Sequence, residues 1–159
     1  MHTYADDRGY SWMSLFDHVP AIPGQVNAST MYPHAVKAWH RHRAQDDYWT
    51  VLRGALKIGL FNTESEARTA ELRLAGPAPG ADRSAVIEVA AGAGRAVYLG
   101  AARPGVLRIP AGLWHGGVAL GGEAALLLYY VTRKYDPQEP DEERAAWDQF
   151  AFQWCPEFK

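Results

Sequence analysis

From Gly24 onward, glycine and proline divide the chain into short apolar segments. The longest of these, residues 124–131, has only the length of a strand. Short segments rich in aromatic and β-branched residues, bounded by turn residues, favour strands over helices. We therefore expect an all-β sandwich or small barrel. The predicted strands cover residues 48–52, 55–61, 67–74, 86–89, 96–99, 106–109, 113–120 and 124–134.

Two glycine turns and one proline interrupt this pattern sharply. The turn at Arg53–Gly54 predicts a β-hairpin, and so does the turn at Gly121–Gly122. Residues 26–39 predict a further pair of strands, broken at Pro33. In each case we expect the two flanking strands to pair with each other.

The two ends of the chain differ in character from the middle. The first 23 residues are mixed and aromatic, and they predict an extended arm with at most one turn of helix. Near the other end, Asp141 is typical of a helix N-cap, and Glu142 and Glu143 suit the first turn, where the helix dipole favours negative charge. We expect this helix to end near Phe150. The predicted regions are an arm (1–23), a barrel (24–135) and a helix with a tail (136–159).

Composition excludes several classes of protein. A chain of 159 residues suits one domain, and a net charge of −2 is unsuited to nucleic-acid binding, which needs a basic excess. No apolar run approaches the roughly 20 residues that span a membrane. The single Cys155 fits a reducing compartment, and the N-terminus has no basic start followed by an apolar stretch. We therefore expect a cytoplasmic protein without membrane or nucleic-acid partners.

Three of the six histidines stand in a pattern that suits metal binding. His40 and His42 are two residues apart, so in a strand their rings project to one face. Asp47 follows closely, and Pro110 and Gly112 form a turn that delivers His115 to the start of a strand. Three imidazoles and a carboxylate suit a divalent ion such as zinc, iron, nickel, copper or manganese. The alternative is that His40 and His42 are solvated side chains of a basic loop.

The same residues resemble known sequence motifs. His40-Arg41-His42, Asp47 and Gly54 resemble the first cupin motif, with Asp in place of the usual Glu. Residues 110–115, Pro-Ala-Gly-Leu-Trp-His, resemble the second cupin motif. His34 replaces the glycine that opens the first motif, and Ala119 stands where an asparagine usually closes the second. The resemblance implies a cupin jelly-roll barrel, here followed by the short C-terminal helix.

A narrower resemblance extends from about residue 35 to about residue 148. Residues 107–116 and 128–137, which include Pro-x-Gly-x-x-His-Gly and Tyr-Asp-Pro, are similar to the dTDP-4-dehydrorhamnose 3,5-epimerase branch of the cupins. That family implies a homodimer that acts on a 4-keto-6-deoxy nucleotide sugar without a metal. A histidine removes the proton beside the ketone, and a tyrosine returns one from the opposite face. Carried over by motif, the base is His40 and the acid is Tyr129, with Tyr130 as the alternative.

The sequence also departs from that family near the proposed base. Arg41 and His42 stand where the family often has an aromatic residue and a glutamine, and Asp47 replaces the family's lysine. The aspartate that usually assists the base has no clear counterpart, and Asp148 is the remaining candidate. Two of these departures, His42 and Asp47, complete the predicted metal-ligand set.

Aromatic and basic residues near the motifs are candidates for substrate binding. Trp39, Trp49 and Trp114 could form an aromatic wall for a ring-shaped ligand, or else belong to the core. Arginine forms paired bonds to phosphate oxygens, so basic side chains here could clamp a diphosphate or else be solvated. The candidates are Arg41, Arg43, Arg53 and Arg108.

Three functional hypotheses follow from these observations. The first is an isomerase that resembles the nucleotide-sugar 3,5-epimerases and acts on a small carbonyl compound. The second is a metal-dependent isomerase, lyase, cyclase or dioxygenase with the ion at His40, His42, Asp47 and His115. The third is a cupin that binds a small ligand without catalysis.

Overall fold

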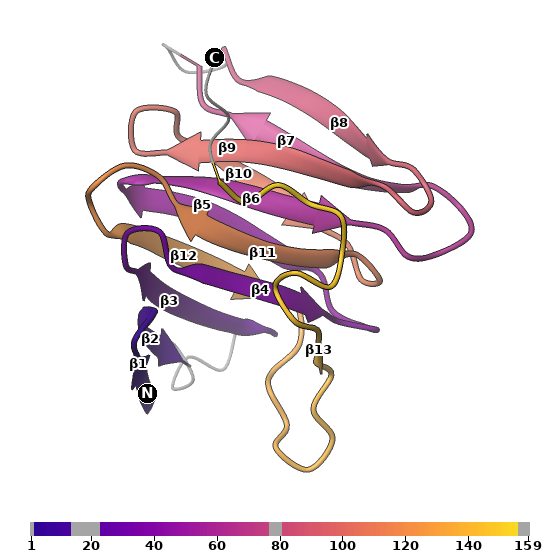
Figure 1. Cartoon of the computed structure of the whole chain (residues 1–159), viewed down its shortest axis with the longest axis horizontal. Coiled ribbons are helices and arrows are strands. Elements are labelled where there is room, and N and C mark those ends of the chain that lie inside the picture. The colour runs from indigo at the N-terminus through magenta and orange to yellow at the C-terminus, as the bar shows by residue number, and fades with distance from the viewer. Residues whose placement is uncertain (1, 14–22, 77–80, 156–159) are drawn as a thin grey trace.

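The computed structural model shows two antiparallel β-sheets packed face to face (Figure 1). It describes residues 2–13, 23–76 and 81–155. Within these ranges every regular element is a strand, which confirms the predicted all-β jelly roll. No helix in the described ranges has the length and apolar character that crossing a membrane requires.

The larger sheet has eight strands and the smaller sheet has five. In spatial order, the larger sheet consists of β1 (His2–Asp6), β2 (Gly9–Met13), β3 (Gln25–Met31), β12 (Ala125–Val131), β5 (Asp47–Arg53), β10 (Gly105–Ile109), β7 (Arg68–Leu74) and β8 (Arg83–Val89). The smaller sheet consists of β13 (Glu143–Arg144), β4 (Val36–Arg41), β11 (Trp114–Ala119), β6 (Ala55–Phe61) and β9 (Gly94–Gly100).

The predicted turns are present, but they connect the two sheets. Gly54 has φ of 70° and Gly121 has φ of 77°, a left-handed conformation that glycine adopts without steric cost. At Gly54 the chain passes from β5 to β6, and at Gly121 from β11 to β12, each time into the opposite sheet. The strands β3 and β4, on either side of Pro33, are also divided between the sheets. The three predicted strand pairings were therefore wrong, because turn residues determine where the chain reverses but not which strand becomes its neighbour.

The ends of the chain are β-structured as far as they are described. Strands β1 and β2 pair with each other, and β2 continues the larger sheet through β3, so residues 2–13 contain no helical turn. The rest of the predicted arm, residues 14–22, lies outside the described residues. The predicted helix over 141–150 is wrong. Glu143 and Arg144 form β13 instead, and the Ala145 amide and carbonyl bond to Trp39 at 3.1 and 3.0 Å.

Packing explains why the C-terminal segment is extended. A main core fills the space between the sheets with residues such as Leu56, Ile58 and Leu107. A second, aromatic cluster lies on the outer face of the smaller sheet, where the C-terminal segment crosses β6 and β11 (Figure 1). This outer cluster contains Trp39, Phe61, Trp114, Val118 and Trp154, with Phe150 and Phe152 against it.

Gly59 allows this close cover. A Cβ atom at Gly59 would lie 2.7 Å from the Trp154 ring and 2.9 Å from the rings of Phe152 and Trp39. The Lys57 ammonium also donates to the backbone carbonyl of Cys155 at 3.3 Å. The C-terminal segment is therefore an integral part of the fold.

Removal of the ring at the centre of the outer cluster should destabilise the protein strongly. Trp39 is fully buried against Trp154, with ring centroids 4.7 Å apart. We expect Trp39→Ala to lower the free energy of unfolding by about 3–5 kcal/mol, measured by urea denaturation. Trp147, which is 56% exposed, is the matched control. Trp147→Ala should change the free energy of unfolding by less than about 0.5 kcal/mol. Equal losses in the two variants would contradict this assignment of the cluster.

Candidate active site

A β-bulge in β4 selects which of its side chains face the space between the sheets. His40 lies opposite His115 of β11, whereas Lys37 lies opposite Gly117, so three steps along β4 match two steps along β11. The extra residue lets both Ala38 and Trp39 pack against the outer cluster. Lys37 and His40 consequently both line the interior cavity.

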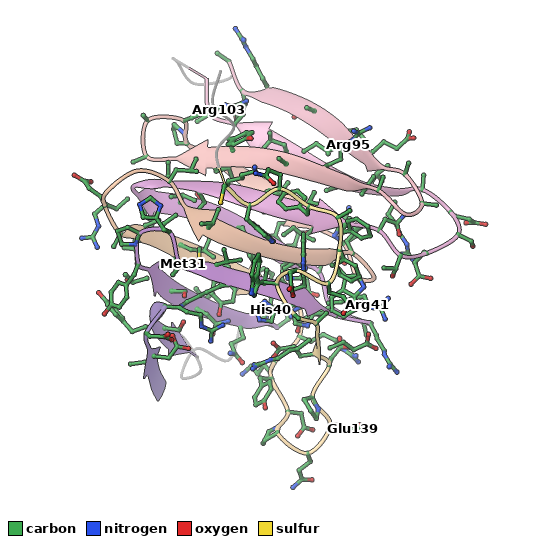
Figure 2. The ribbon with its side chains drawn as sticks, in the orientation of Figure 1. Met31, His40, Arg41, Arg95, Arg103 and Glu139 are labelled. Carbon is green, nitrogen blue, oxygen red and sulfur yellow. The ribbon has the colours of Figure 1, made fainter. Side chains whose placement is uncertain are left out.

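The cavity opens at one end of the sandwich and has a volume of about 1070 Å³. Its walls include residues of the β1–β2 hairpin and inward-facing side chains of β3, β4, β5, β11 and β12. Residues 132–136, Glu139, Asp141, Glu142 and Arg144 complete the lining. The connection from β12 to β13 extends beyond the sheets, and Glu139 lies at its lower tip (Figure 2). The cavity is therefore bounded by both sheets and by the projecting loop.

Three of the predicted metal ligands converge in this cavity. Nε2 of His115 lies 3.5 Å from one carboxylate oxygen of Asp47, and Nε2 of His42 lies 3.8 Å from the other. One ligand atom from each of these residues lies within 4.8 Å of the other two. His40 does not join this group, although its ring centroid is 6.4 Å from that of His115. The structure thus provides a three-residue set in place of the predicted four.

Backbone carbonyls fix the orientation of both rings in this set. Nδ1 of His115 bonds to the Leu113 carbonyl at 3.0 Å, and Nδ1 of His42 bonds to the Asp141 carbonyl. Because a carbonyl only accepts hydrogen bonds, each Nδ1 carries a proton. Each Nε2 is then directed toward Asp47.

Asp47 is a buried carboxylate that remains ionised. Its oxygens accept hydrogen bonds from the Gln45 amide at 3.0 Å and the Trp49 indole at 3.1 Å. Burial acts to raise the pKa of Asp47, but hydrogen bonding and charge from His115, with the charge of His42, hold that pKa below its ordinary value. Asp47 is therefore a fixed negative charge inside the cavity.

His40 lies beside a carboxylate that the sequence analysis did not connect with it. Nε2 of His40 is 3.8 Å from Oε1 of Glu142. Burial, with the charge of His115, lowers the pKa of His40 to about 4, while the carboxylate of Glu142 opposes this effect. Near neutral pH the ring is uncharged and able to accept a proton. Asp148, the predicted partner, is exposed and does not line the cavity.

Ion pairs on the outer side hold Glu142 in place. Glu143 accepts a hydrogen bond from Nε of Arg41 at 2.9 Å and also contacts Arg43. The carboxylate of Asp141 accepts the backbone amides of Arg43 and Ala44 at 2.8 and 2.9 Å. Together these contacts fix residues 141–143 against the end of β4, which places Glu142 on the cavity side.

The register of β12 separates the two candidate tyrosines. Tyr129 pairs with Trp49 of β5 and lines the cavity, with ring centroids 6.3 Å apart. Tyr130 points to the other side of the sheet and packs on Tyr48. Burial and the charges of Asp47 and Glu142 raise the pKa of Tyr129, so its phenol keeps its proton.

Most of the predicted substrate contacts lie elsewhere. Trp49 lines the cavity, but Trp39 and Trp114 belong to the outer cluster. Arg41 lies over the Trp114 ring at 4.7 Å, on the same outer side. Strand alternation explains this correction, because residues next to an inward-facing histidine face outward.

The other arginines proposed to clamp a diphosphate are also outside the cavity. Arg108 bonds to Asp46 at 3.0 Å and to Glu71. Arg53 and Arg43 are exposed, and neither lines the cavity. Five other basic residues line the cavity: Arg8, Lys37, Arg133, Lys134 and Arg144. The bulge turns Lys37 inward, and Arg144 bonds to Glu142 at 2.9 Å. The alternation of side chains along a strand could not have placed Lys37 in the cavity, because its inward position depends on that bulge.

The fold and the cavity define a cupin with a histidine and a tyrosine on facing sheets. Comparisons with known proteins show which members of this class the chain is similar to. The chain is 32% identical over 91% of its length to a protein described as a probable low-salt glycan biosynthesis epimerase, Agl13 of Haloferax volcanii, of which it covers 81%. It is 29% identical over 98% of its length to the spore coat polysaccharide biosynthesis protein SpsL of Bacillus subtilis, of which it covers 92%.

A solved structure supports the fold. The crystal structure of NovW, a 4-keto-6-deoxy sugar epimerase from the novobiocin biosynthetic gene cluster of Streptomyces spheroides, has a TM-score of 0.62. This match has 19% identity and covers 98% of this chain and 72% of NovW. No protein-family model matches the chain. On the strength of these relatives, the chain belongs to the dTDP-4-dehydrorhamnose 3,5-epimerase family of cupins.

Loss of the Glu143 ion pairs should loosen the strand that carries Glu142. We expect Glu143→Gln to speed hydrogen exchange of the Ala145 amide severalfold, because β13 is held to β4 by few backbone bonds. Glu64→Gln is the matched control, since Glu64 also contacts Arg41, at 3.1 Å, but lies outside β13. Exchange measured by mass spectrometry or NMR should be unchanged at Ala145 in this control. Equal effects of the two variants would contradict the positioning role of Glu143.

Proposed function

We propose that this protein epimerises a 4-keto-6-deoxy sugar nucleotide, or a similar small carbonyl compound, at a carbon next to the ketone. One observation carries this proposal: His40 and Tyr129 line one cavity from opposite sheets, the first uncharged and the second protonated. Inversion at carbon needs a proton acceptor and a proton donor on different faces of the substrate. The facing sheets support this arrangement.

The proposed reaction moves one proton off the sugar and a different proton on. A ketone acidifies the neighbouring C–H bond, and the His40 ring accepts that proton while the bonding electrons form an enolate. The carboxylate of Glu142, 3.8 Å away, stabilises the imidazolium that results. The Tyr129 phenol then protonates the same carbon from the other face, and solvent exchange restores both residues.

The two steps can be separated with the candidate substrate in deuterated water. We expect His40→Ala to abolish deuterium incorporation next to the ketone, because no base remains. Tyr129→Phe should keep incorporation but lose inversion by at least about 100-fold, since His40 can only return a proton to the original face. Mass spectrometry follows incorporation and NMR follows configuration.

The neighbouring tyrosine provides the control for this experiment. Tyr130 lies on the opposite side of β12, so Tyr130→Phe should preserve both incorporation and inversion. Full inversion by Tyr129→Phe would contradict the assigned acid. Binding without any incorporation in the wild type would favour the non-catalytic alternative.

Glu142 should affect turnover more than binding. Glu142→Gln keeps the size of the side chain but removes the charge beside His40, so we expect kcat to fall roughly 10-fold or more with little change in KM. Asp148→Asn, at an exposed residue that does not line the cavity, is the control and should leave kcat unchanged. Steady-state kinetics measure both constants. A change in KM alone would assign Glu142 to substrate binding.

A metal-dependent reaction is the second candidate function, and the convergence of His42, Asp47 and His115 favours it. Such an enzyme would use an ion to polarise a carbonyl group.

A homodimer and a cytoplasmic location complete the proposal. The resemblance to the 3,5-epimerase family supports the homodimer, which light scattering would test.

A further inference from the structure

Asp46 is a charged residue beside the cavity that the proposed reaction does not use. Its neighbours Gln45 and Asp47 line the cavity, whereas Asp46 does not. Its carboxylate accepts hydrogen bonds from Nε and Nη2 of Arg108 at 3.0 and 2.8 Å, and from the backbone amide of Ala111 at 3.0 Å. The side chain of Asp46 is therefore fixed to β10 and to the turn that follows β10.

The backbone of Asp46 holds the first residue of the projecting loop between β12 and β13. The Asp46 amide donates to Oγ1 of Thr132 at 2.9 Å, and the Thr132 amide donates to the Asp46 carbonyl at 3.1 Å. Thr132 directly follows β12, and residues 132–136 of the loop line the cavity. Asp46 therefore connects the cavity-lining part of the loop to β10.

The number of bonds makes this connection stronger than an ordinary surface ion pair, which contributes little. Five hydrogen bonds converge on Asp46, and its side chain is 24% exposed. A carboxylate that binds a guanidinium through two nitrogen atoms also has a restricted geometry. Asp46 is thus suited to fix the position of the loop and not merely to balance a charge.

The same contact gives a role to Arg108, which the sequence analysis named as a substrate contact. Arg108 is held by Asp46 and Glu71 and does not line the cavity. An effect of Arg108 on substrate binding must therefore be indirect, through Asp46 and the loop.

We propose that Asp46 is a positioning residue that determines how the loop between β12 and β13 meets the substrate, and that Arg108 acts through it. Loss of the carboxylate should displace the loop residues that line the cavity. Tyr129 should keep its place, because β12 is paired on both sides, and so should His40, because β4 is paired with β11 and β13. Substrate binding then weakens while proton transfer continues. The effect on binding rests on the proposed function, whereas the attachment of the loop does not.

The proposal predicts a change in KM without a change in kcat. With dTDP-4-dehydrorhamnose as the probe in deuterated water, Asp46→Ala should raise KM at least about 5-fold and change kcat less than about 2-fold. Asp46→Asn keeps an oxygen that can accept the Ala111 amide, so it should show a smaller rise in KM. A loss of kcat at unchanged KM would overturn the proposal, because Asp46 would then act on the residues that transfer protons.

Asp82 provides a closely matched control. Its carboxylate also binds an arginine, Arg73, through Nε at 3.0 Å, and a backbone amide, that of Gly76, at 3.2 Å. Asp82 precedes β8 and does not line the cavity. Asp82→Ala should therefore leave KM and kcat unchanged, and a rise in KM equal to that of Asp46→Ala would contradict the role of Asp46.

A double variant tests whether Arg108 acts through Asp46. Arg108→Met should raise KM as Asp46→Ala does, and the variant with both changes should be no worse than either alone, because one contact is lost in all three. Additive losses would show that Arg108 acts independently of Asp46 and would overturn that part of the proposal.

The attachment of the loop is tested without any substrate. Asp46→Ala should speed hydrogen exchange of the Ala111 and Thr132 amides severalfold, measured by NMR, and Asp82→Ala should not. Unchanged exchange at both amides would overturn the proposal. Circular dichroism and thermal unfolding separate a displaced loop from a lost fold. If the wild type incorporates no deuterium into the probe, the epimerase proposal fails, while the exchange rates still decide whether Asp46 holds the loop.

Discussion

The bulge in β4 is the constraint on which the rest of the structure depends. Because two consecutive residues pack outward, one short strand contributes Trp39 to the outer cluster and both Lys37 and His40 to the cavity. The backbone of Trp39 also pairs with Ala145, which draws the C-terminal segment along the sheet. The position of the proposed base and the cover of the sheet therefore depend on the same few residues.

The sequence predicted the local features well and the long-range features poorly. The strands, the glycine turns and the two histidine motifs are determined by neighbouring residues, so a pattern could identify them. Strand partners depend on how the sheets pack, and the turn at Gly54 is compatible with either arrangement. The segment from Asp141 has the charges of a helix start, but burial of Phe150 and Trp154 against the sheet outweighs that preference.

The same distinction between local and long-range features applies to the site. The motifs fix the places of five cavity residues on the strands, so the sequence could identify them: His40, His42, Asp47, His115 and Tyr129. Glu142 could not, since its approach to His40 depends on the pairing of β13 with β4. The shared cavity also gives the two proposed catalytic groups their complementary states. Removal from water keeps the histidine neutral and the tyrosine protonated, so a single environment prepares both an acceptor and a donor.

The loop between β12 and β13 is anchored at both of its ends and projects from the sheets between them (Figure 1). Its last residues are tied down by Glu143 and Asp141, and its first by the ladder of β12. The middle of the loop can therefore change in length and composition without displacing the groups that transfer protons. Changes in the middle of this loop should therefore alter what the cavity accepts while leaving the proposed acid and base in position.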